Sequence, residues 1–357
     1  MFSLSSRGTI ASLVMLSFMI SAQAQQTSEL KHRFVQVNGI RMHIAEQGEG
    51  PLVVLVHGFP ELWYSWRHII PAIAAAGYHA VAPDMRGYGQ TDAPPRVEDY
   101  TQLQLVGDIV ALVKVLGYDQ AVIAGHDWGS PVASNCAILR PDIFRAVVLL
   151  SVPYASRGEG GVKPTEAMKT RVPPGTQFYQ TYFQEPGVAE KELEADPKRT
   201  MRMLLYAGSG SIPKEHKLPF VFGVNQKLLD GTKDPGLLPK WLRPEELDYY
   251  ASEFARTGFR GGLNWYRNQD FFWQNTTFLI GRKMLQPTLF IGGTDDLVYA
   301  FARAGVDNME KSVPNLWRKV LLPGVGHWTE QEAPEDVKKN FVEFLEYVEK
   351  VAPPTGK

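Results

Sequence analysis

Hydrophobic positions along the chain form two kinds of pattern that alternate with each other. Short apolar runs without polar alternation are typical of strands buried on both faces of a sheet. They lie at 52–56, 78–83, 121–124, 146–150, 287–292 and 319–322. Apolar residues at helical spacing occupy 62–76, 101–116, 130–139 and 335–351. The alternation predicts an α/β fold with a mostly parallel central sheet flanked by helices.

The α/β rhythm is interrupted in the middle of the chain. Residues 154–262 are rich in proline, glycine, aromatic and charged residues, and hold only short helical segments such as 188–205 and 244–256. No run in this stretch has the character of a core strand. The sequence therefore predicts a core made of 25–153 and 263–357. We expect 154–262 to form an inserted helical cap over the carboxyl edge of the sheet.

The first 24 residues have the pattern of a bacterial-type signal peptide. Arg7 precedes an apolar run over 10–20, and an A-x-A-like cleavage site ends at Ala24. The run is shorter than the ~20 apolar residues that span a bilayer. We expect cleavage and export to the periplasm or the exterior; the alternatives are an N-terminal membrane anchor or a buried helix. Cys136 is the single cysteine, which excludes an intramolecular disulfide.

Composition narrows the range of partners. The apolar fraction is 44%, the charged fraction is 21% and the formal net charge is −1, which is ordinary for a globular protein. This balance gives no reason to expect binding to nucleic acid or to an anionic membrane surface. The sequence also lacks a phosphate-binding loop and a His-Glu-x-x-His zinc motif. We therefore expect no metal and no organic cofactor.

The stretch 121–139 carries the most specific chemical signal. A buried strand is followed by Gly125-His-Asp-Trp-Gly129 and then by a helix. This is the small-x-nucleophile-x-small arrangement of a nucleophile elbow, in which larger flanking side chains would clash. Serine is the usual central residue, but here it is Asp127. A carboxylate at this position attacks carbon directly and forms an alkyl ester, which points away from esterases and lipases.

Two further polar residues follow later strands of the predicted sheet. Asp296 comes after the run at 287–292, and His327 comes after the run at 319–322. The order nucleophile, acid, histidine is that of α/β-hydrolases, so we assign Asp296 to orient His327 and His327 to act as general base. Asp295 competes with Asp296, which fits a Gly-x-x-Asp spacing from Gly293. Alternatively, Asp296 is only a helix N-cap and His327 only packs in a loop.

A possible oxyanion hole lies after the first core strand. His57-Gly-Phe-Pro60 follows the run at 52–56. The backbone N–H groups of Phe59 and Trp128 are candidates to stabilise negative charge on a carbonyl oxygen. Taken alone, this tetrapeptide is also compatible with a simple Gly-Pro turn.

Together these motifs resemble the α/β-hydrolase epoxide hydrolases, in particular the hydrolase domain of the soluble enzymes without their N-terminal phosphatase domain. The matching stretches are 57–67, 84–89, 125–129, 179–187, 258–268 and 326–329. The resemblance implies that two cap tyrosines, Tyr179 and Tyr266, hydrogen-bond the epoxide oxygen and protonate it. Tyr266 then sits at the edge of the cap. By composition alone, the other candidates are Tyr182, Tyr249 and Tyr250.

Three functions are compatible with these residues. The first is hydrolysis of a small apolar epoxide to a vicinal diol, with water as the second substrate. The second is a haloalkane or haloacid dehalogenase that uses the same Asp127, Asp296 and His327, with Trp128 suited to holding halide. The third is a secreted binding or virulence protein on this scaffold. The complete set of Asp127, Asp296 and His327 argues against lost catalysis, and the two cap tyrosines favour the epoxide hydrolase.

Overall fold

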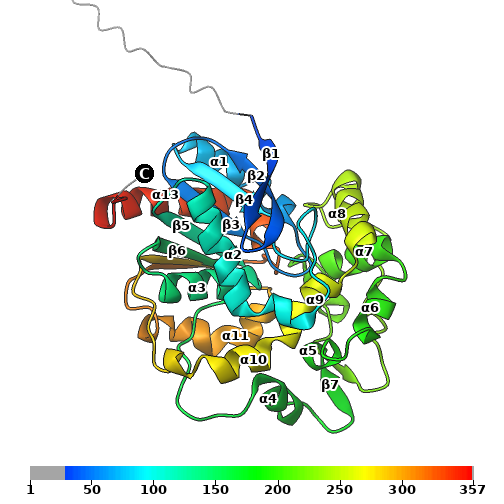
Figure 1. The fold of residues 1–357 in the computed structure, drawn as a ribbon. Helices are drawn as coiled ribbons and strands as arrows, with labels where there is room; N and C mark the ends of the chain where they lie inside the picture. The colour runs from blue at the N-terminus through cyan, green and yellow to red at the C-terminus, as the bar shows by residue number, and fades with distance from the viewer. Residues whose placement is uncertain (1–28, 356–357) are drawn as a thin grey trace, which may run out of the picture.

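A central sheet of eight strands organises the computed structural model, which describes residues 29–355 (Figure 1). Its strand order is β1-β2-β4-β3-β5-β6-β9-β10. Neighbouring strands are parallel except for β2, which is antiparallel to both β1 and β4. The strands are β1 (Lys31–Val37), β2 (Ile40–Gln47), β3 (Leu52–Val56), β4 (His79–Pro83), β5 (Ala121–His126), β6 (Phe144–Leu150), β9 (Thr288–Gly293) and β10 (Leu316–Leu322). The predicted mostly parallel sheet is confirmed.

Helices cover both faces of this sheet and bury its apolar runs. On one face, α2 (Gln102–Val115) and α3 (Gly129–Leu139) pack with the sheet and the cap in one apolar cluster. On the other face, α1 (Ile70–Ala75) and α13 (Pro334–Val351) form a second cluster. All residues of β3, β5, β6 and β9 are buried, which explains why these strands show no polar alternation.

The helices differ from the prediction where proline residues start new segments. The helix predicted over 62–76 is instead a 3-10 turn, η1 (Trp63–Trp66), followed by α1 with Pro71 in its first turn. The segment predicted at 188–205 is two helices, α6 (Val188–Leu193) and α7 (Pro197–Gly208). Asp196 caps α7 by accepting a hydrogen bond from the Arg199 N–H. Proline is favoured in the first turn of a helix and disfavoured inside it, so Pro71 and Pro197 mark these starts.

The segment between β6 and β9 contains the predicted cap and its connections to the core, beside the sheet (Figure 1). It also holds a small antiparallel sheet of β7 (Thr176–Phe178) and β8 (Val221–Gly223), which the sequence pattern did not indicate. The helices here are α4 (Pro164–Thr170), α5 (Tyr179–Tyr182), α6, α7, η3 (Lys214–His216), α8 (Pro244–Thr257), α9 (Arg260–Arg267), α10 (Gln269–Asn275) and η4 (Thr277–Leu279). The domain boundaries at 154 and 262 stay a prediction.

The remaining helices are η2 (Val97–Tyr100), α11 (Leu297–Asp307), η5 (Met309–Lys311) and α12 (Thr329–Glu332). Within residues 29–355, no helix combines the length and the hydropathy needed to cross a bilayer. The predicted signal peptide, residues 1–24, lies outside the described residues.

Candidate active site

Asp127 lies in the tight turn between β5 and α3, with its backbone in the left-handed region at φ 47°. The flanking glycines are required by contact. A Cβ on Gly125 would lie 2.1 Å from the carbonyl oxygen of Gly129, and one on Gly129 would lie 2.1 Å from that of Val56. These are distances that real side chains do not reach. The strained turn holds Asp127 at the carboxyl edge of the sheet, as the sequence predicts.

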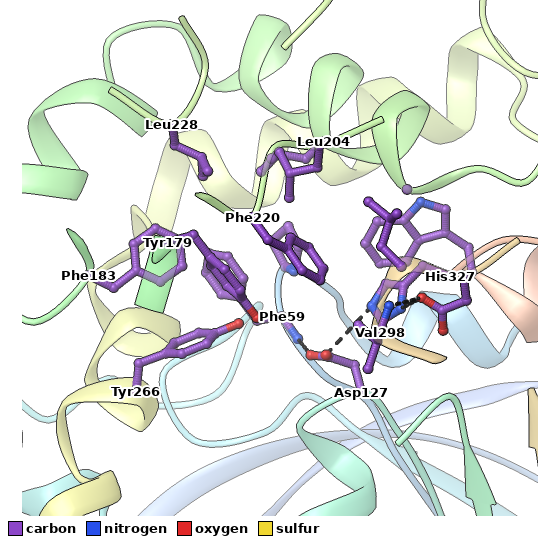
Figure 2. Close-up of a pocket in the computed structure, with 16 residues that line it drawn as sticks. Phe59, Asp127, Tyr179, Phe183, Leu204, Phe220, Leu228, Tyr266, Val298 and His327 are labelled. Atoms are coloured by element: carbon purple, nitrogen blue, oxygen red, sulfur yellow. Dashed lines mark hydrogen bonds and ion pairs between the residues drawn. The ribbon is translucent and has the colours of Figure 1, made fainter. Parts of the chain in front are cut away.

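The carboxylate of Asp127 contacts the Phe59 N–H with one oxygen and faces the His327 imidazole with the other. The Phe59 N–H donates to Oδ1 of Asp127 at 2.8 Å. Gly58 allows this approach, because a Cβ there would lie 2.4 Å from the same oxygen. Nε2 of His327 is 3.6 Å from Oδ2 of Asp127, a gap that Figure 2 shows as a dashed line. The carboxylate is therefore fixed in direction, with the imidazole beside it.

His327 and Asp296 form the second part of the site. Nδ1 of His327 lies 3.2 Å from Oδ1 of Asp296. Burial alone would lower the pKa of His327, but the negative charges of Asp296 and Asp127 raise it well above the usual value. Burial would raise the pKa of Asp296, but the charge of His327 brings it below the usual value. The structure thus places all three side chains together, in the arrangement expected of a nucleophile, a base and an orienting acid.

Asp296 is both a helix N-cap and the neighbour of His327, the two alternatives that the sequence left open. Its Oδ1 accepts a hydrogen bond from the Val298 N–H at 2.8 Å, so it is the N-cap of α11 as well as the partner of His327. Asp295 is exposed, and its Oδ1 lies 3.3 Å from the hydroxyl of Thr294. The structure therefore places Asp296, and not Asp295, at the histidine.

Ser151 is a fourth member of this group that sequence reasoning missed. It directly follows β6, adopts a positive φ of 67° and is fully buried. Its hydroxyl donates to Oδ2 of Asp296 and lies 3.1 Å from Nδ1 of His327. One signal for it was in the sequence, since Ser151 directly follows the strand predicted at 146–150, at the same sheet edge as Asp127 and Asp296.

The two expected tyrosines face Asp127 from the cap side. Tyr179 begins α5 and Tyr266 lies in α9, and Figure 2 shows both hydroxyls directed toward the carboxylate. Their rings are 6.1 Å apart between centroids. Burial raises the pKa of both phenols, so they stay protonated and able to donate. Gln180, which sequence reasoning also missed, donates from Nε2 to the Tyr179 hydroxyl at 2.8 Å.

The other candidate tyrosines have partners elsewhere. The Tyr182 hydroxyl donates to Glu192, and the Tyr249 hydroxyl accepts from the Trp63 indole N–H. The Tyr250 hydroxyl contacts Ser65. None of the three lines the cavity at Asp127.

Trp128 is the N-cap residue of α3, and its ring packs edge-on against Tyr266 with the centroids 4.9 Å apart. Its side chain thus contributes to the wall behind Tyr266. The expected role of the Trp128 N–H in an oxyanion hole stays a prediction, whereas the Phe59 N–H already contacts the carboxylate.

A cavity lies between Asp127 and the cap (Figure 2). Apart from Asp127, Asp296, His327 and the two tyrosine hydroxyls, its lining side chains are apolar or glycine. The lining residues are Phe59, Pro60, Asp127, Tyr179, Phe183, Leu204, Gly208, Leu218, Phe220, Leu228, Tyr266, Asp296, Leu297, Val298, His327 and Trp328. Such a lining suits a neutral apolar molecule that brings one reactive polar group to Asp127.

Comparison with known proteins identifies the family. The family model described as alpha/beta hydrolase fold matches residues 51–333. Epoxide hydrolase A of Mycobacterium tuberculosis is 45% identical over 319 residues, covering 88% of this chain and 96% of that protein. Bifunctional epoxide hydrolase 2 of Sus scrofa is 38% identical, covering 89% of this chain and 56% of that longer protein. The chain belongs to the epoxide hydrolases of the α/β-hydrolase fold.

Solved epoxide hydrolase structures agree with this assignment. An epoxide hydrolase from an endophytic Streptomyces superposes with a TM-score of 0.86 at 44% identity, covering 90% of this chain and 96% of that one. Epoxide Hydrolase A from Mycobacterium thermoresistibile gives a TM-score of 0.84 at 44% identity, covering 89% and 98%. The family inferred from the sequence motifs is confirmed.

Behind Asp127 of this epoxide hydrolase lies a fully buried cluster of Glu61, His126 and Glu330, which sequence reasoning did not single out. Oε2 of Glu61 is 2.7 Å from Nδ1 of His126, and Oε1 of Glu330 is 3.7 Å from the same nitrogen. Nε2 of His126 is 2.7 Å from the carbonyl oxygen of His327. The cluster therefore supports the loop that carries His327.

Burial and the neighbouring charges together set the pKa values of this cluster. Burial would raise the pKa of Glu61, but His126 lowers it to about 2. Burial would lower the pKa of His126, but Glu330 and Glu61 raise it to about 9. Burial raises the pKa of Glu330 to about 8. The donor atoms of this group have metal-ligating spacing, yet Glu61 and His126 already hydrogen-bond each other, so the arrangement suits an ion pair with a neutral Glu330 better than a metal.

Proposed function

We propose that this enzyme hydrolyses a neutral, apolar epoxide to a vicinal diol through a covalent ester on Asp127. The observation that carries the proposal is the placement of Asp127 between two sets of groups. Two protonated phenols, Tyr179 and Tyr266, face it across the cavity, and His327 stands beside it. An epoxide held by the phenols presents a ring carbon to the carboxylate.

In the first step, an oxygen of Asp127 attacks a ring carbon and the C–O bond of the epoxide breaks. The bond electrons go to the epoxide oxygen. Tyr179 or Tyr266 donates a proton to that oxygen as the ring opens, and the phenol becomes a phenolate. The product of this step is a hydroxyalkyl ester of Asp127. Because the ester forms by attack on carbon, no base is needed for this half of the reaction.

In the second step, His327 removes a proton from water through Nε2, and the hydroxide attacks Cγ of Asp127. Asp296 holds Nδ1 and stabilises the imidazolium that forms. The Phe59 and Trp128 N–H groups are proposed to stabilise the oxyanion. The bond between Cγ and the ester oxygen then breaks, so the ester oxygen leaves with the alkyl group as an alkoxide. One proton is on the imidazolium of His327 and the other is on the new carboxyl group of Asp127. One of them goes to the leaving alkoxide and the other returns to the phenolate, which gives the diol and restores the enzyme.

The dehalogenase remains the second candidate on the residues alone, since it uses the same Asp127 and His327. A dehalogenase has no use for two phenol donors aimed at the carboxylate, because halide leaves without a proton. The relatives named epoxide hydrolase favour the same choice.

The variant His327→Gln separates these functions. Without the base, the ester accumulates and changes the intact mass of the protein. After incubation with a mixed panel of epoxides, we expect a mass gain equal to one intact epoxide, mapped to Asp127. A gain of an alkyl group from haloalkanes alone would instead support the dehalogenase. The double variant with Asp127→Asn is the control, because it has no carboxylate to alkylate.

We also propose that the protein is exported by its N-terminal residues 1–24. Support comes from Arg7, the apolar run over 10–20 and the A-x-A-like site at Ala24. Expression of the full chain in a bacterial host, followed by N-terminal sequencing of the periplasmic fraction, tests this. A mature N-terminus at Gln25 is expected. Recovery of uncleaved protein in the cytoplasmic or membrane fraction would contradict it.

A further inference from the structure

An aromatic path connects the active-site cavity with the protein surface. Its outermost residue is Phe301 on α11, whose side chain is 66% exposed. The Phe301 ring packs against Phe178 and Phe220, with centroid distances of 5.4 Å and 5.7 Å. Phe178 ends β7 and Phe220 directly precedes β8, so the end of the small cap sheet faces α11 across these three rings.

The inner end of this path is a candidate catalytic residue. The Tyr179 ring lies 4.7 Å from Phe178 and 5.0 Å from Phe220 between centroids. Phe220 also lines the cavity, where Figure 2 shows it beside Tyr179. The backbone N–H of Tyr179 donates to the carbonyl oxygen of Phe220, which fixes the two residues to each other. One ring therefore separates the exposed Phe301 from the phenol that faces Asp127.

The core side of the path is continuous as well. Leu297 and Val298, at the start of α11, line the cavity. Phe301 follows them by four and three positions, so it lies on the same face of the helix one turn farther out. The apolar wall thus runs along α11 from the cavity to the surface. None of these side chains carries a charge.

Exposure of a single phenylalanine needs no explanation by itself, since many proteins have such residues. Phe278, on η4, is comparably exposed at 58%, and neither it nor Phe301 lines the cavity itself. Phe301 differs because it continues a lined cavity and packs on two rings at its edge. Phe301 therefore adjoins the cavity through Phe220, which lines it.

We infer that Phe301, Phe178 and Phe220 form the entrance by which a neutral apolar epoxide reaches Asp127, with Phe301 as the outer residue that sets access. This inference rests on the proposed function. An apolar substrate loses its water stepwise on an aromatic surface, which favours its entry here. A charged, carboxylate-bearing epoxide gains no such advantage, because the three rings carry no positive charge to pair with its carboxylate.

The test uses the variant Phe301→Cys with a bulky apolar maleimide attached to the new thiol. Selective labelling is possible because Cys136, the only native cysteine, is fully buried. Phe278→Cys, labelled in the same way, is the matched control. Labelling Phe301→Cys is expected to lower kcat/KM for an aryl epoxide by about tenfold or more relative to the unlabelled variant. Labelling the control should change kcat/KM by less than about twofold.

An equal effect of the label on kcat/KM at both positions would overturn the inference that Phe301 lies at the entrance. A second readout does not depend on turnover: the association rate of the neutral dye Nile red, measured by stopped-flow fluorescence. Leu204→Trp fills the cavity and so identifies the fluorescence that comes from dye bound inside it. Only the fluorescence change that this substitution abolishes is used for the rate. The labelled Phe301→Cys variant should slow this rate by about tenfold. If the enzyme hydrolyses no epoxide, the proposed function fails, and the dye rate still decides the entrance: an unchanged rate overturns it.

Discussion

The Ser151 hydroxyl donates a hydrogen bond to Oδ2 of Asp296, the oxygen that does not face His327. Nδ1 of His327 is 3.1 Å from the same hydroxyl, so the serine joins the acid and the base. Replacing Ser151 by alanine leaves one oxygen of a fully buried carboxylate without its donor. Loss of a hydrogen bond to a charged group predicts a roughly tenfold slower ester hydrolysis in Ser151→Ala.

Ester formation does not use His327, so Ser151→Ala should alkylate Asp127 at nearly the normal rate. Single-turnover kinetics with an epoxide, read as the amount of ester by intact mass, separate the two steps. The control is Ser134→Ala, which truncates a different buried serine, one that lies on α3. Equal slowing of both steps in Ser151→Ala would mean that the serine only supports the fold.

The two phenols predict a different kinetic pattern. Tyr179→Phe and Tyr266→Phe each remove one donor to the epoxide oxygen, and each should slow ester formation by about 10²-fold. The double variant should form no ester. Tyr182→Phe is the control, since that hydroxyl donates to Glu192 instead. Rapid-quench measurement of the ester in a His327→Gln background isolates this step. Normal ester formation in the double variant would remove the tyrosines from the mechanism.

The ester mechanism also predicts the source of oxygen in the diol. Hydroxide attacks Cγ of Asp127, so the oxygen that the first diol carries away comes from the carboxylate and not from water. A single turnover in ¹⁸O-labelled water with enzyme in excess should therefore give unlabelled diol and one ¹⁸O in Asp127. Mass spectrometry of the diol and of the peptide that contains Asp127 measures both. Labelled diol in the first turnover would indicate direct attack of water on the epoxide.

The raised pKa of Glu330 predicts that the free energy of unfolding depends on pH. Burial raises its pKa from 4.5 to about 8, so the folded protein holds a proton that the unfolded chain releases. The unfolded state then binds fewer protons between pH 4.5 and 8, and this group lowers the free energy of unfolding progressively over that window. Glu330→Gln imitates the neutral acid and removes the penalty. Its Tm should exceed that of the unsubstituted protein by a margin that grows from pH 5 to pH 8.

Thermal unfolding at several pH values checks this margin, with the exposed Glu335→Gln as the control. The groups facing Glu330 are His126 and Glu61. Because the pKa of His126 is raised from 6.5 to about 9, His126 adds its own loss of stability above pH 6.5 in both proteins, so the comparison rests on the difference in Tm between them. A constant difference in Tm across the window would show that Glu330 is already ionised in the folded protein.

Much of the fold and the central chemistry could be predicted from the sequence. The uninterrupted apolar runs gave the strands because burial on both faces removes the need for polar alternation. Gly125 and Gly129 gave the elbow, and the contacts that a Cβ would make at each show why no other residue fits. Local spacing was sufficient for these features.

Other features depend on segments that are far apart in the chain. Ser151 meets Asp296 across 145 positions, and Glu61 meets His126 across 65. No local pattern distinguishes such a serine or glutamate from one on the surface. Helix ends were mispredicted for a different reason, because Pro71 and Pro197 start new helices inside segments whose apolar spacing continues. Each proline outweighs the apolar spacing, because proline inside a helix removes a hydrogen bond and clashes with the preceding turn.

Asp296 is at once the partner of His327 and the N-cap of α11. The helix whose side chains form one wall of the cavity is therefore anchored to the residue that holds Nδ1 of His327. A substitution that tilts α11 to admit a larger epoxide also moves the carboxylate, and with it the imidazole. Substrate range and turnover are thus mechanically linked, so engineering of the wall along α11 should produce epistasis with Asp296 and Ser151 and not independent, additive effects.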